Sequence, residues 1–395
     1  MAERSPALSR SARRFDELLA ARGLAGRVVE LPASTRTAAE AAEAVGCELR
    51  QIVKSLVFRA RNSGTAVLIL VAGSNRVDEA RMARVVGEPL DRADPEFVRS
   101  ATGFAIGGVP PTGHTTPLRT FLDLDLLELG EVWAAAGHPH AVCRLSSLEL
   151  VGLAPGTAVS VAPPGTPASG TRWATFDCYG TLVDWRTGFA EATARLGVAV
   201  SREDPDRLFR AYLAAEPSVE GGRYVPYRDV MASAFEKAAE SVGSPIPAAT
   251  ARELPESVPE WPIFPDVPEA LDALRRSGVR VGILSNIDRD LLDATLRRQG
   301  IPSDAVVTAE EVRSYKPAPA HWARFLRRTG AEPRSVLHVS ASYEYDLGTA
   351  AALGFPTAYV ARYGALAHGR TVTAAFPGLR ELPASRAVVD LPAPR

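Results

Sequence analysis

Three short segments in the second half of the chain supply the groups that hydrolysis by a carboxylate nucleophile requires. Asp177 follows the apolar run WATF and precedes the turn CYGT, in which Thr181 is the last residue. Ser285 and Asn286 end a second apolar run, and Lys316 stands in the segment SYKP. A carboxylate nucleophile forms an ester, a cation neutralises the developing charge, and hydroxyl or amide donors bind the leaving oxygen or halide. We therefore expect Asp177 to be the nucleophile of a hydrolase.

A fourth segment, SASYEYD, also follows an apolar run and adds polar groups to this set. Ser340 and Ser342 are candidate substrate-binding residues. Glu344 and Asp346, together with Asp177, could hold Mg²⁺, because proteins bind magnesium through carboxylate oxygens. A solvated loop is the alternative interpretation of the acidic pair. The residues alone leave a metal-dependent and a metal-free reaction open.

In the first half, Lys54 stands in the middle of the apolar run QIVKSLVF. Burial of a lysine is costly and lowers its pKa, so this position indicates a function; the alternative is a side chain that reaches a sheet edge. Only three of the 45 basic residues are lysines, and Lys54 and Lys316 are two of them. Gly107 and Gly108 precede a Pro-Pro turn, where exposed backbone N–H groups suit an acyl oxyanion. These residues predict an acyl-binding site.

The segments that carry these residues fall into two predicted domains. The stretch APPGTPASG has no hydrophobic periodicity and consists of turn-forming and small residues, which is typical of a linker. We therefore expect a first domain at 1–162, a linker at 163–171 and a second domain at 172–395. A chain of 395 residues is long enough for two or three domains.

After the linker, short apolar runs alternate with helical patterns. The runs VRVGILSN, AVVTAEE, SVLHVSA and PTAYVAR have strand length and are separated by amphipathic segments such as DRDLLDATLRRQG. This alternation predicts a Rossmann-like, doubly wound parallel sheet of the α/β class, with the reactive groups at the carboxyl ends of the strands. A long helical region near 187–255 interrupts it after the first strand.

The first domain mixes helical and strand-like segments. Residues 9–22 and 37–49 are expected to be helical, and the β-branched runs 52–58 and 66–72 are expected to be strands. This pattern predicts a mixed α+β domain, and propensity alone does not fix its topology.

Composition limits the classes of function. The net charge of −1 gives no electrostatic argument for nucleic acid, and no apolar run reaches the roughly 18 residues of a membrane span. The three cysteines do not form a Cys-x-x-Cys pair, and the basic first residues lack the apolar core of a secretory signal. We therefore expect a cytoplasmic protein without a membrane partner.

The second half resembles the haloacid dehalogenase superfamily over residues 172–380, on the motifs FDCYGT, LSN, SYKP and the acidic segment after the fourth strand. The resemblance implies that Thr181 supports Asp177, that Ser285 and Asn286 bind the leaving group, and that Lys316 neutralises charge. It also implies a helical cap, at about 187–265, that closes over a small anionic substrate.

The residue two positions after the nucleophile separates two branches of this superfamily. Phosphatases usually carry a second Asp there, whereas this chain has Tyr179, which is typical of the 2-haloacid dehalogenases and is counted among the substrate-binding candidates. The segment from Ser340 to Asp346 departs from the dehalogenase pattern, because an Asn is missing and the spacing is one residue longer. A dehalogenase would need no cofactor, and the alternative is a Mg²⁺-dependent phosphatase.

The first half resembles the YbaK/ProX family of aminoacyl-tRNA deacylases over residues 13–162, on the segments TAAEAA, QIVKSLVF, RVD, RAD and TGFAIGGVPPTGH. The resemblance implies aminoacyl-tRNA as a partner, Lys54 as the central residue, and Gly107 and Gly108 at the carbonyl of the ester. His114 follows a turn and is expected to be structural rather than a base. His138 and His140 lack further ligands at metal spacing.

The two halves together predict a bifunctional hydrolase that deacylates mischarged tRNA with its first domain and uses an Asp nucleophile in its second. The alternative is a first domain that binds aminoacyl groups or tRNA without cleavage, joined to a phosphatase.

Overall fold

The computed structural model describes residues 8–31, 37–161, 171–198, 203–220 and 223–392. The chain divides near residue 167 into two compact units, and each is described by itself. The predicted linker, 163–171, lies outside the described residues except for Thr171. Among the described residues no helix is both long and apolar enough to cross a membrane.

The first unit is built on one mixed sheet. Its described strands follow the order β1-β7-β6-β2-β3-β5-β8, and β4 pairs with β2 beside this path. The pairs β2–β3 and β6–β7 are antiparallel, whereas β2–β6, β3–β5 and β5–β8 are parallel. The strands are β1 (Val28–Glu30), β2 (Ile52–Ala60), β3 (Ala66–Ala72), β4 (Leu90–Arg92), β5 (Arg119–Asp123), β6 (Glu131–Ala135), β7 (Ala141–Ser146) and β8 (Thr157–Val159).

Short helices surround this sheet, and side-chain caps begin most of them. Thr37 and Ser146 form capping boxes, and Asp78 and Asp94 accept a hydrogen bond from the third residue of the helix that each precedes. The helices are α1 (Arg10–Ala20), α2 (Ala38–Val45), α3 (Glu79–Val86), α4 (Pro95–Thr102), α5 (Leu124–Leu127) and α6 (Ser147–Leu153).

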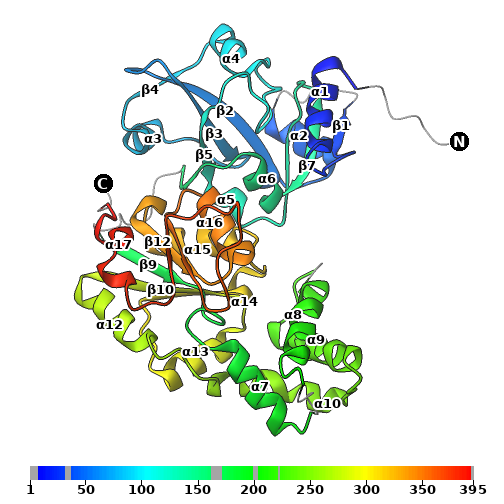
Figure 1. Ribbon diagram of the computed structural model, residues 1–395. Coiled ribbons are helices and arrows are strands. Elements are labelled where there is room, and N and C mark those ends of the chain that lie inside the picture. The colour runs from blue at the N-terminus through cyan, green and yellow to red at the C-terminus, as the bar shows by residue number, and fades with distance from the viewer. Residues whose placement is uncertain (1–7, 32–36, 162–170, 199–202, 221–222, 393–395) are drawn as a thin grey trace, which may run out of the picture. The chain divides into compact units, whose positions relative to one another are not determined.

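The second unit contains a parallel sheet in the order β11-β10-β9-β12-β13-β14 (Figure 1). The chain enters at β9, a central strand, and its next strands pair on both sides of it, so the strand order reverses at β9. The strands are β9 (Arg172–Phe176), β10 (Val279–Ser285), β11 (Ala305–Thr308), β12 (Val336–Ser340), β13 (Thr357–Val360) and β14 (Ala374–Phe376).

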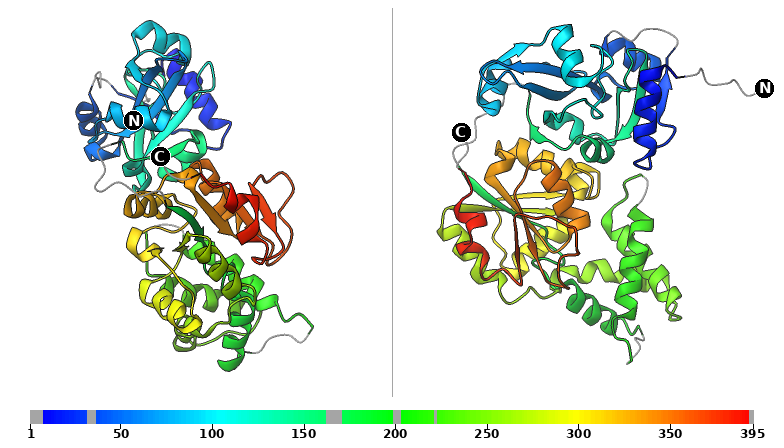
Figure 2. Two further views of the ribbon diagram at one scale, coloured as in Figure 1. Left: turned by 90° about the vertical axis from the view of Figure 1, so that its left-hand side faces the viewer. Right: turned by 45° about the horizontal axis from the view of Figure 1, so that its top comes forward.

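Helices lie on both sides of this sheet (Figure 2). They are α12 (Val267–Arg276), α13 (Arg289–Gln299), α14 (Ala309–Val312), α15 (Ala320–Thr329), α16 (Gly348–Ala352) and α17 (Arg386–Val389), with a π-helix at Tyr343–Leu347. Between β9 and β10 the chain forms a separate helical layer of α7 (Trp185–Arg195), α8 (Arg207–Glu220), α9 (Tyr227–Ser241), α10 (Ala248–Ala251) and α11 (Glu253–Ser257) (Figure 1). This layer occupies the position that the sequence assigns to a cap.

The predicted fold class is confirmed for both units. Each apolar run expected to be a strand is one, and the α/β alternation of the second half produces the parallel sheet. The final strand, β14, is an addition that the sequence pattern did not predict. It has three residues, and its register with β13 depends on tertiary pairing rather than on an apolar pattern of its own.

Candidate active sites

Asp177 follows directly after β9, at the carboxyl edge of the parallel sheet. A tight turn comes next, in which Gly180 has a φ of 94° and its N–H donates to the carbonyl oxygen of Val183 (2.8 Å). This left-handed conformation favours glycine and folds the chain back over the strand end. Thr181 consequently donates its hydroxyl to Oδ2 of Asp177 at 2.8 Å, and it accepts from the backbone N–H of Ala341 at 3.0 Å.

Lys316 connects Asp177 to a second carboxylate. Its Nζ donates to Oδ1 of Asp177 (2.9 Å), to Oδ1 of Asp346 (2.7 Å) and to the carbonyl oxygen of Leu284 (2.9 Å). The side chain of Lys316 is 2% exposed. An ammonium group has three N–H donors, and these contacts use all of them. Burial disfavours the charged amine, but Asp177 and Asp346 reverse this effect and raise the pKa of Lys316.

The two carboxylates around Lys316 differ in their surroundings. Burial raises the pKa of Asp177, and Lys316 and Thr181 oppose that shift. Burial acts on Asp346 in the same way, but the neighbouring Lys316 and His338 outweigh it and lower its pKa. Asp346 is therefore the carboxylate that stays ionised more easily, while Asp177 depends on Lys316 for its charge.

His338 is a residue of this site that the sequence pattern did not identify. It lies in β12, is fully buried, and places Nε2 3.0 Å from Oδ1 of Asp346 and Nδ1 2.9 Å from the hydroxyl of Thr175. Ser340 donates to the other oxygen of Asp346 at 3.1 Å. The only signal in the sequence was a histidine at an inward position of an apolar strand. Such a histidine is more often part of a core, so the pattern alone did not distinguish it.

Several side chains that were predicted to bind substrate form hydrogen bonds within the protein instead. The amide of Asn286 donates to the carbonyl of Lys316 (3.1 Å) and accepts from its N–H (2.7 Å). Ser340 holds Asp346, and the hydroxyl of Ser342 accepts from the N–H of Tyr345 at 3.1 Å. The hydroxyl of Tyr179 lies 2.8 Å from that of Thr295. Ser285 ends β10 and is buried next to Asn286. These hydrogen bonds hold the loops at the carboxyl edge of the sheet in place.

The three acids predicted as Mg²⁺ ligands have different partners. Nζ of Lys316 donates to Oδ1 of both Asp177 and Asp346. Glu344 is 63% exposed and pairs with Arg370 instead. No group of three or more His, Cys, Asp or Glu side chains within the described ranges is arranged to hold a metal. The structure thus does not bring Glu344 together with Asp177 and Asp346, and its role as a ligand of a metal-dependent enzyme stays a prediction.

The π-helix explains the unusual spacing between Ser340 and Asp346. It spans Tyr343–Leu347, directly before α16, and Ser342 caps its first turn. A π-helix accommodates one more residue in a turn than an α-helix, so it absorbs an inserted residue without displacing the helix after it. Asp346 thereby reaches Lys316, while Glu344 points to the surface.

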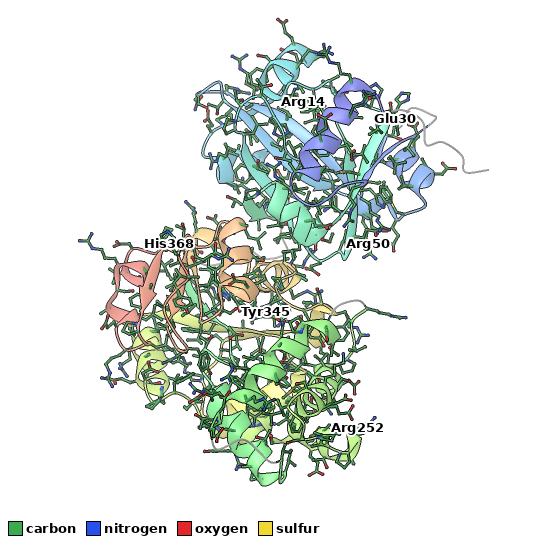
Figure 3. All side chains as sticks on the ribbon, turned by 45° about the vertical axis from the view of Figure 1, so that its right-hand side comes forward. Arg14, Glu30, Arg50, Arg252, Tyr345 and His368 are labelled. Carbon is green, nitrogen blue, oxygen red and sulfur yellow. The ribbon has the colours of Figure 1, made fainter. Side chains whose placement is uncertain are left out.

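The cap contributes one buried and one half-buried acid that the sequence pattern also did not reveal. Oε1 of Glu216, in α8, accepts from the hydroxyls of Tyr212 (3.0 Å) and Tyr227. Burial raises the pKa of Glu216 to about 7 and that of Glu220 to about 8. Glu220 is hydrogen-bonded to Tyr345, the neighbour of Asp346, and Figure 3 labels this tyrosine beside the cap helices. The cap thus reaches the segment that carries Asp346.

In the first unit, Lys54 lies in β2 and points toward two carbonyl groups. Its Nζ donates to the carbonyl oxygens of Gly73 (3.0 Å) and Asn75. Burial lowers the pKa of Lys54, Asp123 partly offsets this shift, and Arg76 adds to it. Within the described residues two acceptors hold the ammonium group, which leaves its third N–H for a ligand.

Lys54 borders a pocket of about 530 Å³. Most of its lining is apolar, and its polar residues are Lys54, Ser55, Asn75, Arg76, Glu79 and Arg92. The hydroxyl of Ser55 is buried and has no hydrogen-bond partner in the described part of the chain. A pocket of this size is within the usual range of ligand-binding pockets in proteins.

The two glycines predicted at the ester carbonyl have different surroundings. Gly107 borders the pocket with a φ of 86°. The N–H of Gly108 donates to the carbonyl of Ala105 at 3.0 Å, and a Cβ there would lie 2.9 Å from the backbone of His138. Position 108 thus has no room for a side chain, because the backbone of His138 lies too close. Nε2 of His114 lies 2.8 Å from the carbonyl of Pro110, as a structural residue of the turn would.

Comparisons with known proteins match the two halves separately. Residues 32–153 match the model of the aminoacyl-tRNA editing domain, and residues 171–354 match that of the haloacid dehalogenase-like hydrolases. The uncharacterized protein YwhH of Bacillus subtilis (strain 168) is 32% identical over 123 residues, which are 31% of this chain and 78% of that protein.

A second relative and one solved structure extend these matches. (S)-2-haloacid dehalogenase 1 of Pseudomonas sp. (strain CBS-3) is 29% identical over 195 residues, 48% of this chain and 85% of the enzyme. The crystal structure described as a putative trans-editing enzyme for prolyl tRNA synthetase is 54% identical, covers 40% of this chain and 99% of its own, and has a TM-score of 0.38.

Proposed function

Because the chain belongs to the aminoacyl-tRNA editing family in its first half and to the haloacid dehalogenase-like hydrolases in its second, we propose that it is a bifunctional hydrolase. The first domain hydrolyses the ester of mischarged tRNA. The second displaces a leaving group from a small anionic substrate through Asp177, as its relatives named (S)-2-haloacid dehalogenases do with 2-haloacids.

In the second domain Asp177 begins the reaction as a carboxylate. One of its oxygens attacks the carbon that bears the leaving group, the carbon–halogen bond breaks, and the halide departs with the electron pair. Lys316 and Thr181 orient the two oxygens. Water then attacks the carboxyl carbon of the resulting ester, which releases the hydroxy acid and a proton and restores Asp177. While Asp177 is esterified, Asp346 remains as the counter-charge of Lys316.

One observation carries this half of the proposal, the ammonium of Lys316 between Asp177 and Asp346. It gives Asp177 a cationic partner that favours the charged form of the carboxylate. Tyr179 supports the same reading, because it stands where a phosphatase places its proton-donating acid and its hydroxyl is hydrogen-bonded to Thr295. A departing halide needs no proton, whereas an alcohol does.

The test for this half is a substrate panel with the full chain. We expect halide release from one enantiomer of 2-chloropropanoate at the same rate with Mg²⁺ and with EDTA, and no release by Asp177→Asn. Asp184→Asn is unsuitable as a control because the half-buried Asp184 caps α7, so Glu191→Gln, at an exposed position of that helix, is preferred. Phosphate release from p-nitrophenyl phosphate that requires Mg²⁺ would contradict the proposal.

In the first domain Lys54 is proposed to hold the aminoacyl ester. Two carbonyl oxygens fix its ammonium group, and the remaining N–H faces a ligand in the adjoining pocket. Gly107 lets the backbone approach the ester closely. We assign no protein base, because the imidazole of His114 is bonded within its own turn, and the attacking group is water or the terminal hydroxyl of the tRNA.

Deacylation assays separate an enzyme from a binding module. We expect prolyl-specific tRNA that carries the wrong amino acid to be deacylated by the wild type and by Lys237→Ala, but not by Lys54→Ala. Lys237 is a suitable control because it is an exposed lysine of α9, in the other unit. Binding of the charged tRNA without its hydrolysis, unchanged by Lys54→Ala, would favour a module that only binds.

A further inference from the structure

The buried carboxylate of Asp123 supports the backbone segment that binds Lys54. Asp123 ends β5, caps α5 and is 1% exposed. Its Oδ2 accepts from the backbone N–H of Ala72 at 3.1 Å and from the side-chain amide of Asn75 at 2.7 Å. Ala72 and Asn75 are the two ends of the short segment at the end of β3, so one carboxylate oxygen holds both ends of it.

That segment contains both acceptors of Lys54. The carbonyl oxygens of Gly73 and Asn75 receive hydrogen bonds from Nζ, and Gly73 lies between the two residues that Asp123 holds. A Cβ at Gly73 would lie 2.1 Å from the carbonyl oxygen of Leu49, which leaves the segment no room to move in that direction. Asp123 therefore holds the backbone segment 72–75, and this segment in turn holds the ammonium group of Lys54.

Asp125 provides an internal comparison. Its Oδ2 accepts from the second N–H of the Asn75 amide at 2.8 Å, so both carboxylates bind the same amide group. Only Asp123 also binds Ala72, and only Asp123 raises the pKa of Lys54. Replacement of either aspartate by asparagine removes one negative charge beside Asn75. Only Asp123→Asn also removes the counter-charge of Lys54.

From these contacts we propose that Asp123 is a positioning residue for deacylation, which fixes the ammonium of Lys54 through the segment 72–75 and supplies its counter-charge. The inference rests on the proposed function of the first domain. The charged groups that face Lys54 are Asp123 from β5 and Arg76 after β3, and Glu79 and Arg92 border the same pocket. Arg76 acts against Asp123, since it lowers the pKa of Lys54.

A direct test measures the pKa of the Lys54 side chain. The chain has three lysines, so protein labelled with ¹³C at lysine Cε gives few signals, and Lys54→Arg identifies the relevant one. We expect Asp123→Asn to lower the pH at which the Lys54 signal titrates, because the variant loses a nearby negative charge. Asp125→Asn is expected to leave that midpoint in place.

Kinetics provide the second readout. For Asp123→Asn we expect kcat for deacylation to fall about tenfold to a hundredfold, since misplacement of a catalytic group by an ångström has effects of this order, with little change in KM. The alkaline limb of its pH profile should move down with the Lys54 midpoint. Asp91→Asn, at a surface ion pair with Arg61, should match the wild type.

The outcomes are distinct. A Lys54 midpoint that Asp123→Asn leaves unchanged, or that Asp125→Asn lowers equally, overturns the inference. If Asp123→Asn does not fold, Asn75→Ala takes its place, because it breaks the link to Asp123 but retains the carbonyl, and an unchanged kcat then overturns the inference. A wild-type protein without deacylase activity contradicts the proposed function alone, and the midpoint of Lys54 still decides the role of Asp123.

Discussion

Glu216 offers a quantitative test of how the cap is packed. Its side chain is buried in α8 between two tyrosine hydroxyls, and burial raises its pKa from 4.5 to about 7. In the unfolded chain Glu216 loses its proton near 4.5, whereas the folded protein keeps that proton until about pH 7. The unfolded state therefore binds fewer protons between these values, and stability falls as the pH rises through this window.

The size of the effect follows from the width of the window. The difference between 4.5 and about 7 corresponds to about 3 kcal/mol of unfolding free energy, present below pH 4.5 and lost above pH 7. Glu216→Gln removes the titration and keeps an oxygen that accepts from Tyr212 and Tyr227. Any constant cost of the amide is the same at both pH values, so it cancels when the pH dependence of variant and wild type is compared.

The assay is urea unfolding at pH 5 and pH 8, followed by tryptophan fluorescence. Four of the five tryptophans belong to the second half, so this signal reports mainly on the unit that contains the cap. We expect the loss of stability between the two pH values to be smaller by about 2.5 kcal/mol in Glu216→Gln than in the wild type, because part of the effect lies below pH 5. Glu191→Gln, an exposed position on α7, serves as the control. A difference below about 1 kcal/mol would refute the burial of Glu216.

Three further predictions concern the second unit. Lys316→Arg should lower halide release at least about a hundredfold in steady-state assays, because a planar guanidinium cannot donate to the same three acceptors, and wild-type-like turnover would contradict the assigned geometry. Glu344→Ala should leave turnover unchanged with Mg²⁺ or EDTA, and a loss restored by Mg²⁺ would support the metal-dependent alternative. Arg362→Ala should cost about 3 to 5 kcal/mol in urea unfolding, because the nearly buried Arg362 binds both oxygens of Asp266, and a cost below about 1 kcal/mol would show that the pair is solvated.

The sequence predicts the reactive groups of the second unit better than their contacts. Asp177, Lys316 and Asp346 do come together, because residues after neighbouring parallel strands must meet at one edge of the sheet. Asn286 and Ser340 also lie at that edge, but their side chains bind the backbone of Lys316 and the carboxylate of Asp346. Which partner a polar side chain takes depends on distances of an ångström, and residue spacing does not contain that information.

Other features depend on tertiary structure entirely. His338 and Asp123 each lie in an apolar strand, and the sequence gives no sign that one contacts Asp346 and the other supports Lys54. The extra residue before Asp346 looked like a departure from the dehalogenase motif. The π-helix shows that an insertion can leave the position of the carboxylate intact, so a motif of unusual length is weak evidence against a shared geometry.

The charges of the second unit bear on the small anionic substrate that we propose for it. All three donors of Lys316 are used within the protein, so this lysine neutralises Asp177 and Asp346 and has no further N–H for a substrate carboxylate. The cap adds Glu216 and Glu220, which would repel an anion if they were ionised. Their raised pKa values, about 7 and about 8, keep a large share of both neutral at neutral pH. The cap therefore carries less negative charge beside Tyr345 below these pH values than above them.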